Sequence, residues 1–141
     1  MIAFPLPAFS AQDIHPILVN FTAALAPASI GSDVLGKVLR KQSITHAAWW
    51  MLMCAAAITP FTAAAGWVWK KSAGAMLPAD IITVHQWLGT SLAILFLFLA
   101  GWRLAIHRKE QTPGISYFVL FFVVLAALMY QGSIGGKMVF H

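Results

Sequence analysis

Five histidines are the most chemically informative residues of this sequence, because the chain contains few other ionisable side chains. Four of them lie at the ends of apolar segments: His15, His46, His85 and His141. The fifth, His107, lies in a charged run and is expected to be a solvated loop residue. Neutral imidazole binds zinc and copper, and it is an axial ligand of haem iron. Which histidines could share a metal therefore depends on the elements that position them.

Those elements are four apolar stretches, each long enough to cross a bilayer, which requires roughly 20 mostly apolar residues. Of the 141 residues, 60% are hydrophobic and only 9% are charged, whereas a soluble domain carries about a quarter charged residues. The expected helices span 15–36, 44–69, 81–106 and 115–134, the last ending in a glycine-rich stretch. Short connections make neighbouring helices antiparallel. The expected fold is an all-α membrane protein, with residues 1–141 forming one four-transmembrane-helix up-down-up-down bundle.

The basic residues indicate how this bundle is oriented in the membrane. We call side A the membrane side on which the first helix begins, and side B the opposite side. Six basic residues belong to side B and three to side A; they are, respectively, Lys37, Arg40, Lys41, Arg103, Arg108 and Lys109, and Lys70, Lys71 and Lys137. Cytoplasmic loops carry an excess of lysine and arginine. We therefore expect side B to face the cytoplasm and both termini to face the periplasm or the cell exterior, and the net charge of +5 does not indicate nucleic-acid binding.

His15 and His85 are the best candidate pair of metal ligands. In an up-down-up-down bundle the first and third helices are diagonal across the core, and both histidines lie near side A. Facing helices of a bundle commonly build cofactor sites between them, and two axial imidazoles can hold one haem iron. The sequence thus predicts one b-type haem near side A, with His15 and His85 as its ligands. It leaves quinone binding open.

The residues around this pair agree with a flat cofactor. Small residues allow close approach to helix backbones in membranes, and the candidate pocket residues are Gly66, Gly89, Gly132, Gly135 and Gly136. Lysines at the same surface, Lys70, Lys71 and Lys137, could bind the haem propionates. A ligand histidine usually donates its other N–H to a partner, and Asn20 and Gln86 are the candidates for that role.

Other interpretations of the histidines remain open. A histidine at a helix end can be an unliganded interfacial residue, and glycines in membrane helices often serve packing alone. A copper or zinc site could use His15, His85 and His141. His46, near side B, is a weaker metal candidate, because the fourth helix has no histidine at a matching depth to complete a second haem site.

Asp33 is the one acidic residue within the first predicted helix. An ionisable residue inside a membrane is a functional candidate by default, so proton transfer is one interpretation. Asp33 also lies near Lys37 at side B, which favours an interfacial position in contact with water.

The opening of the first helix resembles a family signature. The run His15-Pro16-Ile17-Leu18-Val19-Asn20-Phe21-Thr22 is similar to HPxxVHFP, which is found in a bacterial family of predicted four-helix membrane proteins of unassigned function. The ending from Gly135 to His141 is similar to that family's GGxLVYxH. This sequence departs at Asn20 and Thr22, where the signature has histidine and proline. The resemblance implies a layout like that of small b-type cytochromes, next to cytochrome c or Rieske-type modules.

Together these observations favour a membrane-embedded b-type haem subunit of a larger redox complex. It would pass single electrons near the periplasmic side, between a quinol pool or other membrane subunits and a periplasmic cytochrome c or iron–sulfur protein. No catalytic set of nucleophile, base and orienting residue emerges, so an electron-transfer or accessory subunit is favoured over an independent enzyme. The alternative is a cofactor-free structural subunit of a respiratory or photosynthetic membrane complex. A transporter is disfavoured because no inverted repeat is detectable.

Overall fold

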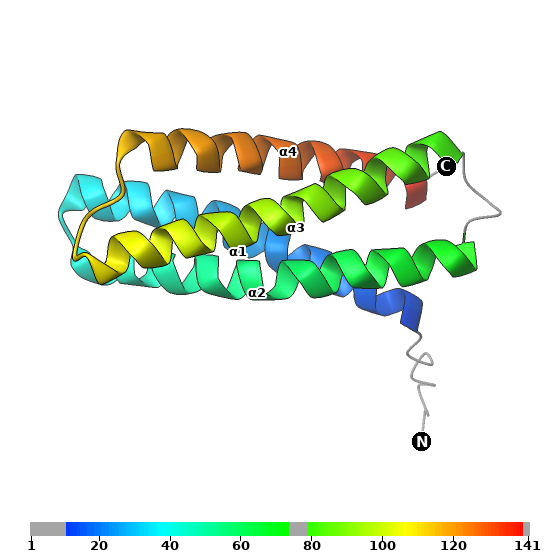
Figure 1. Ribbon diagram of the computed structural model, residues 1–141, viewed down its shortest axis with the longest axis horizontal. Helices are drawn as coiled ribbons and strands as arrows, with labels where there is room; N and C mark the ends of the chain where they lie inside the picture. Colours follow the sequence, from blue (N-terminus) through cyan, green and yellow to red (C-terminus); the bar gives the residue numbers. More distant parts are fainter. Residues whose placement is uncertain (1–10, 74–78, 140–141) are drawn as a thin grey trace, which may run out of the picture.

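The fold consists of four long helices. The computed structural model describes residues 11–73 and 79–139. The helices are α1 (Ala11–Leu39), α2 (Gln42–Ala73), α3 (Ala79–Arg108) and α4 (Ile115–Val139), shown in Figure 1. The described residues contain no strand. All four helices are long and apolar enough to cross a membrane. The expected all-α fold with four spanning helices is confirmed.

Each helix is longer than the apolar stretch that predicts it, and the largest extension at a single helix end is at the C-terminus of α4. The sequence predicts an end near residue 134, but the helix continues through Gly135 and Gly136 to Val139. Glycine weakens a helix chiefly by exposing its backbone to water and by its conformational freedom. In an apolar surrounding the backbone groups have no alternative partner, so the helix retains its hydrogen bonds. The prediction that α4 ends in its glycines is wrong for this reason.

Both side-B turns end their helices in the same way. Arg40 and Glu110 have positive φ angles, 53° and 54°. Beyond them, Lys41 N–H donates to the Gly36 carbonyl at 3.0 Å and Gln111 N–H donates to the Ile106 carbonyl at 3.2 Å. These are the long-range bonds of the Schellman motif. The two tight turns reverse the chain and make α1 antiparallel to α2, and α3 antiparallel to α4.

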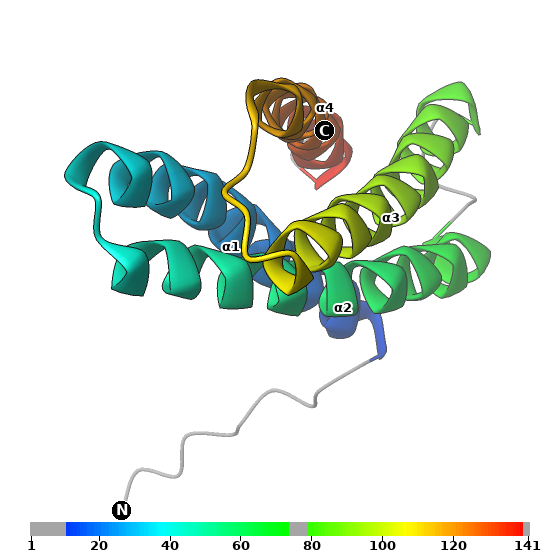
Figure 2. The same cartoon turned by 60° about the vertical axis from the view of Figure 1, so that its left-hand side comes forward.

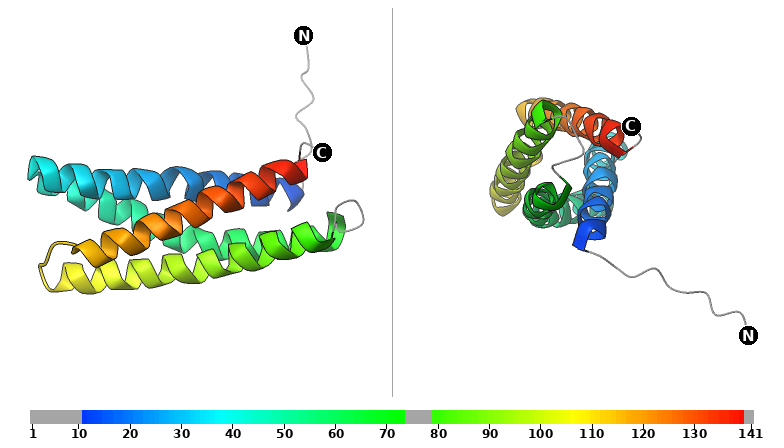
Figure 3. Two further views of the ribbon diagram at one scale, coloured as in Figure 1. Left: turned by 90° about the horizontal axis from the view of Figure 1, so that it is seen from above. Right: turned by 90° about the vertical axis from the view of Figure 1, so that its right-hand side faces the viewer.

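The helices follow one another around the bundle. α1 packs against α2 and α4, and α3 packs against the same two helices, so α1 and α3 are diagonal, as the end-on view in Figure 3 shows. Figure 2 shows α4 crossing above the gap between α1 and α3. The start of α1 and the end of α4 lie at the same end of the bundle (Figure 1). This confirms the expected up-down-up-down order.

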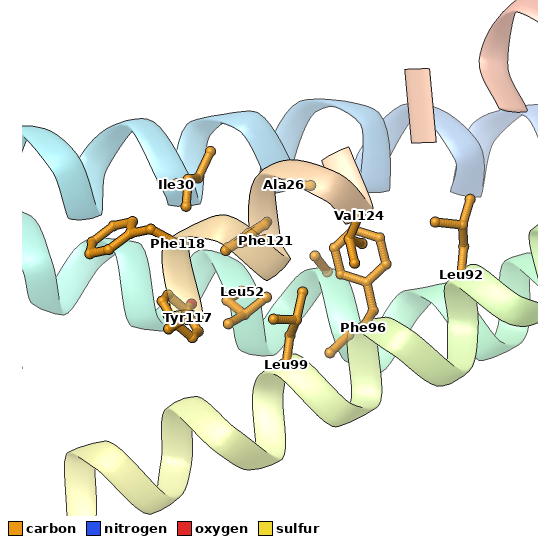
Figure 4. Packing of buried hydrophobic residues seen from close by; sticks show 12 residues of the cluster. Ala26, Ile30, Leu52, Leu92, Phe96, Leu99, Tyr117, Phe118, Phe121 and Val124 are labelled. Atoms are coloured by element: carbon orange, nitrogen blue, oxygen red, sulfur yellow. The ribbon is translucent and has the colours of Figure 1, made fainter. Parts of the chain in front are cut away.

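The core lies in the middle of the bundle and towards side B. Phe96 and Phe121 meet edge to face with ring centres 6.5 Å apart, and Leu52, Leu99 and Tyr117 pack around them (Figure 4). Edge-to-face rings satisfy the attraction between a positive edge and a negative face. Large apolar side chains cover the outward faces, where they meet lipid; examples are Phe61, Ile94, Val123 and Met129.

The closest helix pair, α1 with α2, is joined through small and hydroxylated residues. Ser29 Oγ donates to the Ala48 carbonyl at 2.8 Å, and the hydroxyls of Thr22 and Thr59 lie 3.5 Å apart. Because lipid and protein interiors are equally apolar, membrane helices associate through close packing and hydrogen bonds of this kind. This packing sets the rotation of α1, and with it the direction of the His15 side chain.

Candidate functional site

His15 and His85 lie next to each other near side A, as the sequence predicts. Their ring centres are 6.3 Å apart and their planes are inclined by 80°. His15 comes from the first turns of α1 and His85 from the second turn of α3, and both side chains are half-buried. The two imidazoles thus meet across the diagonal of the bundle, between helices that are not direct neighbours.

α2 holds the His15 ring in place. The His15 Nδ1 lies 2.9 Å from the Thr62 carbonyl oxygen. Because a carbonyl can only accept, Nδ1 carries the hydrogen and Nε2 carries the free lone pair. One turn further along α2, Gly66 makes room for the ring: a Cβ at this position would lie 3.0 Å from His15 Cε1. Thr62 and Gly66 together fix both the position and the tautomer of His15.

α4 contacts His85 at its backbone carbonyl and beside its ring. Gln131 Nε2 donates to the His85 backbone carbonyl at 2.8 Å. One turn later, a Cβ on Gly135 would lie 3.1 Å from His85 Cε1. Gly89 makes room for the Gln131 amide, since a Cβ there would lie 3.0 Å from Gln131 Nε2. On each flanking helix, a residue that hydrogen-bonds the histidine is followed four positions later by a glycine that clears space for its ring.

The structure divides the predicted pocket glycines into those that lie against side chains of the site and those that do not. Gly66, Gly89 and Gly135 accommodate side chains of the site rather than a flat ring lying on their backbones. A Cβ added to Gly132 or Gly136 would meet no atom within 4 Å among the residues that the structure describes, and Lys137 is exposed. Gly132 and Gly136 therefore do not pack against either imidazole.

Several polar atoms around His85 have no partner within the described part of the chain. Lys70 Nζ donates to Gln86 Oε1 at 2.8 Å, but Gln86 Nε2, His85 Nδ1 and Gln131 Oε1 are buried and unpaired. Buried polar atoms are normally satisfied, so an unpaired group calls for an explanation. Three such atoms lie on α3 and α4, in His85 and in residues beside it. The described helices therefore leave hydrogen-bonding groups near the imidazole pair unused.

Thr62 and Gln131 are the site residues that sequence reasoning missed. Asn20 and Gln86 were the expected partners of the imidazoles, but Asn20 is exposed and the Gln86 amide oxygen accepts from Lys70. The available signal was the spacing: Thr62 and Gln131 each precede a glycine by four residues at the side-A end of their helix.

We expect Gly66→Ala to destabilise the protein, because Thr62 prevents the His15 ring from moving away from the new methyl group. Overpacking of this kind costs about 1–3 kcal/mol, partly offset by a gain of about 1 kcal/mol from replacing a helical glycine. The matched control is Gly132→Ala, which should be neutral or slightly stabilising. Unfolding in detergent measures both variants; equal stabilities would show that the ring is not held as described.

A second pair of histidines lies at side B. His107 belongs to the last turn of α3, not to a loop, and its ring centre is 6.3 Å from that of His46 and 5.2 Å from that of Trp49. The expectation of a solvated loop residue is therefore wrong for its position, although its side chain is exposed. His46 Nε2 accepts a hydrogen bond from Trp50 Nε1 at 3.1 Å, which occupies one of the two nitrogens that could bind a metal.

A three-ligand metal site does not emerge from the described residues. None of them form a group of three or more histidine, cysteine, aspartate or glutamate side chains that could hold an ion. His141, the third ligand of the copper or zinc alternative, lies outside the residues that the structure describes. A haem takes only axial ligands from the protein, for which two imidazoles suffice.

Comparison with known protein families places the geometry above in context. A family of predicted membrane proteins, DUF2231, matches residues 11–141. The chain belongs to the DUF2231 family. This confirms the family resemblance expected from the opening and closing motifs, while the family description names no cofactor. Comparison with curated proteins and with solved structures finds no match.

A buried ion pair is the second polar feature of this DUF2231 protein. Arg103 Nη2 on α3 donates to Asp33 Oδ1 on α1 at 2.8 Å, and the side chains are only 4% and 1% exposed. The expectation that Asp33 is interfacial, in contact with water, is wrong. Arg103, counted among the side-B surface charges, is also buried, which leaves five basic residues on that surface.

The ion pair and the imidazole pair share one register. His15 with His85 and Asp33 with Arg103 each join residues 70 positions apart. Within each helix the two residues are 18 positions apart, which is five turns at 3.6 residues per turn and about 27 Å of rise. They therefore share one face of each helix, so α1 and α3 of this DUF2231 protein run parallel with a constant register and carry polar contacts at both ends of the bundle.

Proposed function

We propose that this protein is a membrane-embedded b-type haem protein in which His15 and His85 are the two axial ligands. An imidazole nitrogen binds a first-row metal at about 2.0–2.1 Å and lies about 1.2 Å from its ring centre, so two imidazoles on opposite sides of one metal have centres roughly 6.4 Å apart. The observed separation is 6.3 Å. This agreement is the observation that carries the proposal. Perpendicular ring planes are compatible with it, because each imidazole can rotate about its metal–nitrogen bond.

The tautomer of His15 supports the same role. Its Nδ1–H donates to Thr62, which leaves Nε2 as the nitrogen able to bind a metal. A hydrogen bond from the other ring nitrogen to a fixed acceptor orients a ligand imidazole and raises its basicity. His85 has a buried and unpaired Nδ1 within the described residues, and the Gln131 amide lies against its backbone. Both observations support the proposed axial pair.

A bound haem would supply one-electron transfer. The protein's own groups would position the haem and shield it from water. Thr62 of α2 would orient the His15 imidazole, and Gly135 of α4 lies beside the His85 ring, so both imidazoles would have little freedom to move as ligands. The apolar faces of the helices exclude water from the bundle interior. Lys70, held by Gln86 at side A, offers a positive charge near the site for haem propionates.

The electron partners follow from the position of the site. The imidazole pair lies near side A, and the excess of basic residues on side B favours a periplasmic side A. A soluble periplasmic carrier, such as a cytochrome c or an iron–sulfur protein, would approach there, and a quinol or a neighbouring membrane subunit would be the other partner. The protein would act within a larger redox complex of a bacterial inner membrane.

Purification of the full chain from haem-replete cells tests the proposal. A pyridine haemochrome assay should return about one haem b per chain, with b-type bands in the reduced-minus-oxidised spectrum. Folded protein that contains no haem, and that binds none on titration with hemin, would refute it. That outcome would favour the alternative of a cofactor-free subunit that fills a structural position in a membrane complex.

A further inference from the structure

The Asp33–Arg103 pair is bonded at only one of its two edges. Arginine and carboxylate commonly form two parallel hydrogen bonds, yet here only Nη2 and Oδ1 are joined. Arg103 Nε, which lies on the same guanidinium edge as Nη2, is buried and unpaired within the described residues, and so is Asp33 Oδ2. A donor of Arg103 and an acceptor of Asp33 are thus left open within the ion pair.

A third open group comes from another helix. Tyr117 on α4 is fully buried, its hydroxyl is unpaired among the residues described, and its ring centre lies 6.0 Å from Arg103 Cζ. The three side chains come together from α1, α3 and α4. Apolar groups such as Phe121 pack around Tyr117 (Figure 4). Each open atom in such a surrounding costs free energy, so one partner shared by all three would be strongly favoured.

The open atoms define what that partner must be. Arg103 Nε–H can only donate and Asp33 Oδ2, in an ion pair, can only accept, while the Tyr117 hydroxyl can do either. The partner must accept from one side and donate to another, and it must fit inside a closed core. We propose that Asp33, Arg103 and Tyr117 form a binding site for a single internal water molecule. Buried waters typically make about three hydrogen bonds to groups that are otherwise unsatisfied.

This water would explain how two charges persist in the membrane interior. It completes the hydrogen bonding of the ion pair, which repays its desolvation only when the remaining lone pairs and protons are satisfied. It also joins α4 to the α1–α3 pair, so the polar contact involves three helices instead of two. The inference does not depend on haem, because the cluster lies five turns from the imidazoles along both α1 and α3.

Radiolytic hydroxyl-radical labelling of the full-length protein tests the site, because radicals formed from a bound water oxidise the side chains that touch it. Tyr117 should be hydroxylated although it is fully buried. Phe121, equally buried one turn further along α4, is the internal control and should remain unlabelled. Absence of label at Tyr117, or equal label at both residues, would overturn the proposal without any substitution.

A double variant provides the second arm of the test. Asp33→Leu with Arg103→Met removes two of the three water ligands while leaving Tyr117 in place as the reporter. The label at Tyr117 should fall to the level of Phe121. Retention of the wild-type label in the folded double variant would also overturn the proposal, because the oxidising water would then not be the one held by the ion pair.

Discussion

His85→Ala should yield a folded protein that contains no haem. The imidazole is one of the two proposed axial ligands, and a methyl group cannot replace a nitrogen lone pair. The haem content should fall from about one per chain to background in the haemochrome assay, and the b-type bands should disappear. The same result is expected for His15→Ala, because the two imidazoles face one site at a ring-centre distance of 6.3 Å.

The matched control is His46→Ala. His46 belongs to the other histidine pair of the described structure, which has the same ring-centre distance but lies at side B with exposed side chains. Its removal should leave the haem content and the spectrum unchanged. If His46→Ala removed the haem while His85→Ala retained it, the site would have been assigned to the wrong end of the bundle.

Arg103→Met alone should lower the free energy of unfolding by about 3–5 kcal/mol. The substitution leaves the Asp33 carboxylate buried and without its cation, at a position where its side chain is 1% exposed. Asp33→Leu alone should cost a similar amount, since the guanidinium then lacks its counter-ion. Reversible unfolding in mixed detergent micelles measures both effects.

The double variant Asp33→Leu, Arg103→Met should recover most of this loss. Well-packed apolar residues that replace a whole buried ion pair are often neutral or stabilising, and Leu and Met have suitable volumes for the core around Tyr117. The difference between the double variant and the sum of the singles measures the coupling of the pair. Additive losses would mean that the two side chains act independently, contrary to the contact between them.

The positions of the candidate ligands could be predicted from the sequence because depth in a membrane follows from chain order. Once four apolar segments are recognised, a histidine at the start of the first and one at the start of the third must lie on the same side. The helix-end prediction for α4 failed because glycine was treated as it behaves in water. The prediction for Asp33 failed because Asp33 faces the bundle interior, whereas Lys37, four residues later, is exposed.

The sequence contains a signal for the Asp33–Arg103 contact, but it can be recognised only when the register of α1 relative to α3 is known. The spacing of 18 residues from His15 to Asp33 equals that from His85 to Arg103, and it is a whole number of helical turns. If one pair meets across the bundle, the other must meet as well. Nothing local to Asp33 or Arg103 indicates this, because the correspondence exists only between two parallel helices.

The amino-acid sequence alone determined that this is a four-span membrane protein, and at which end of the bundle His15, His46, His85 and His107 lie. Hydropathy identifies the four spans, because it depends only on local composition. Chain order then fixes the end of the bundle at which each span begins. The tertiary structure decided which neighbours those histidines have, that Thr62 and Gln131 hold them, and that a charged pair is closed inside the core. These depend on how each helix is rotated about its axis. In a membrane the lipid and the core are equally apolar, so hydropathy carries little information about rotation, and only packing between helices sets it.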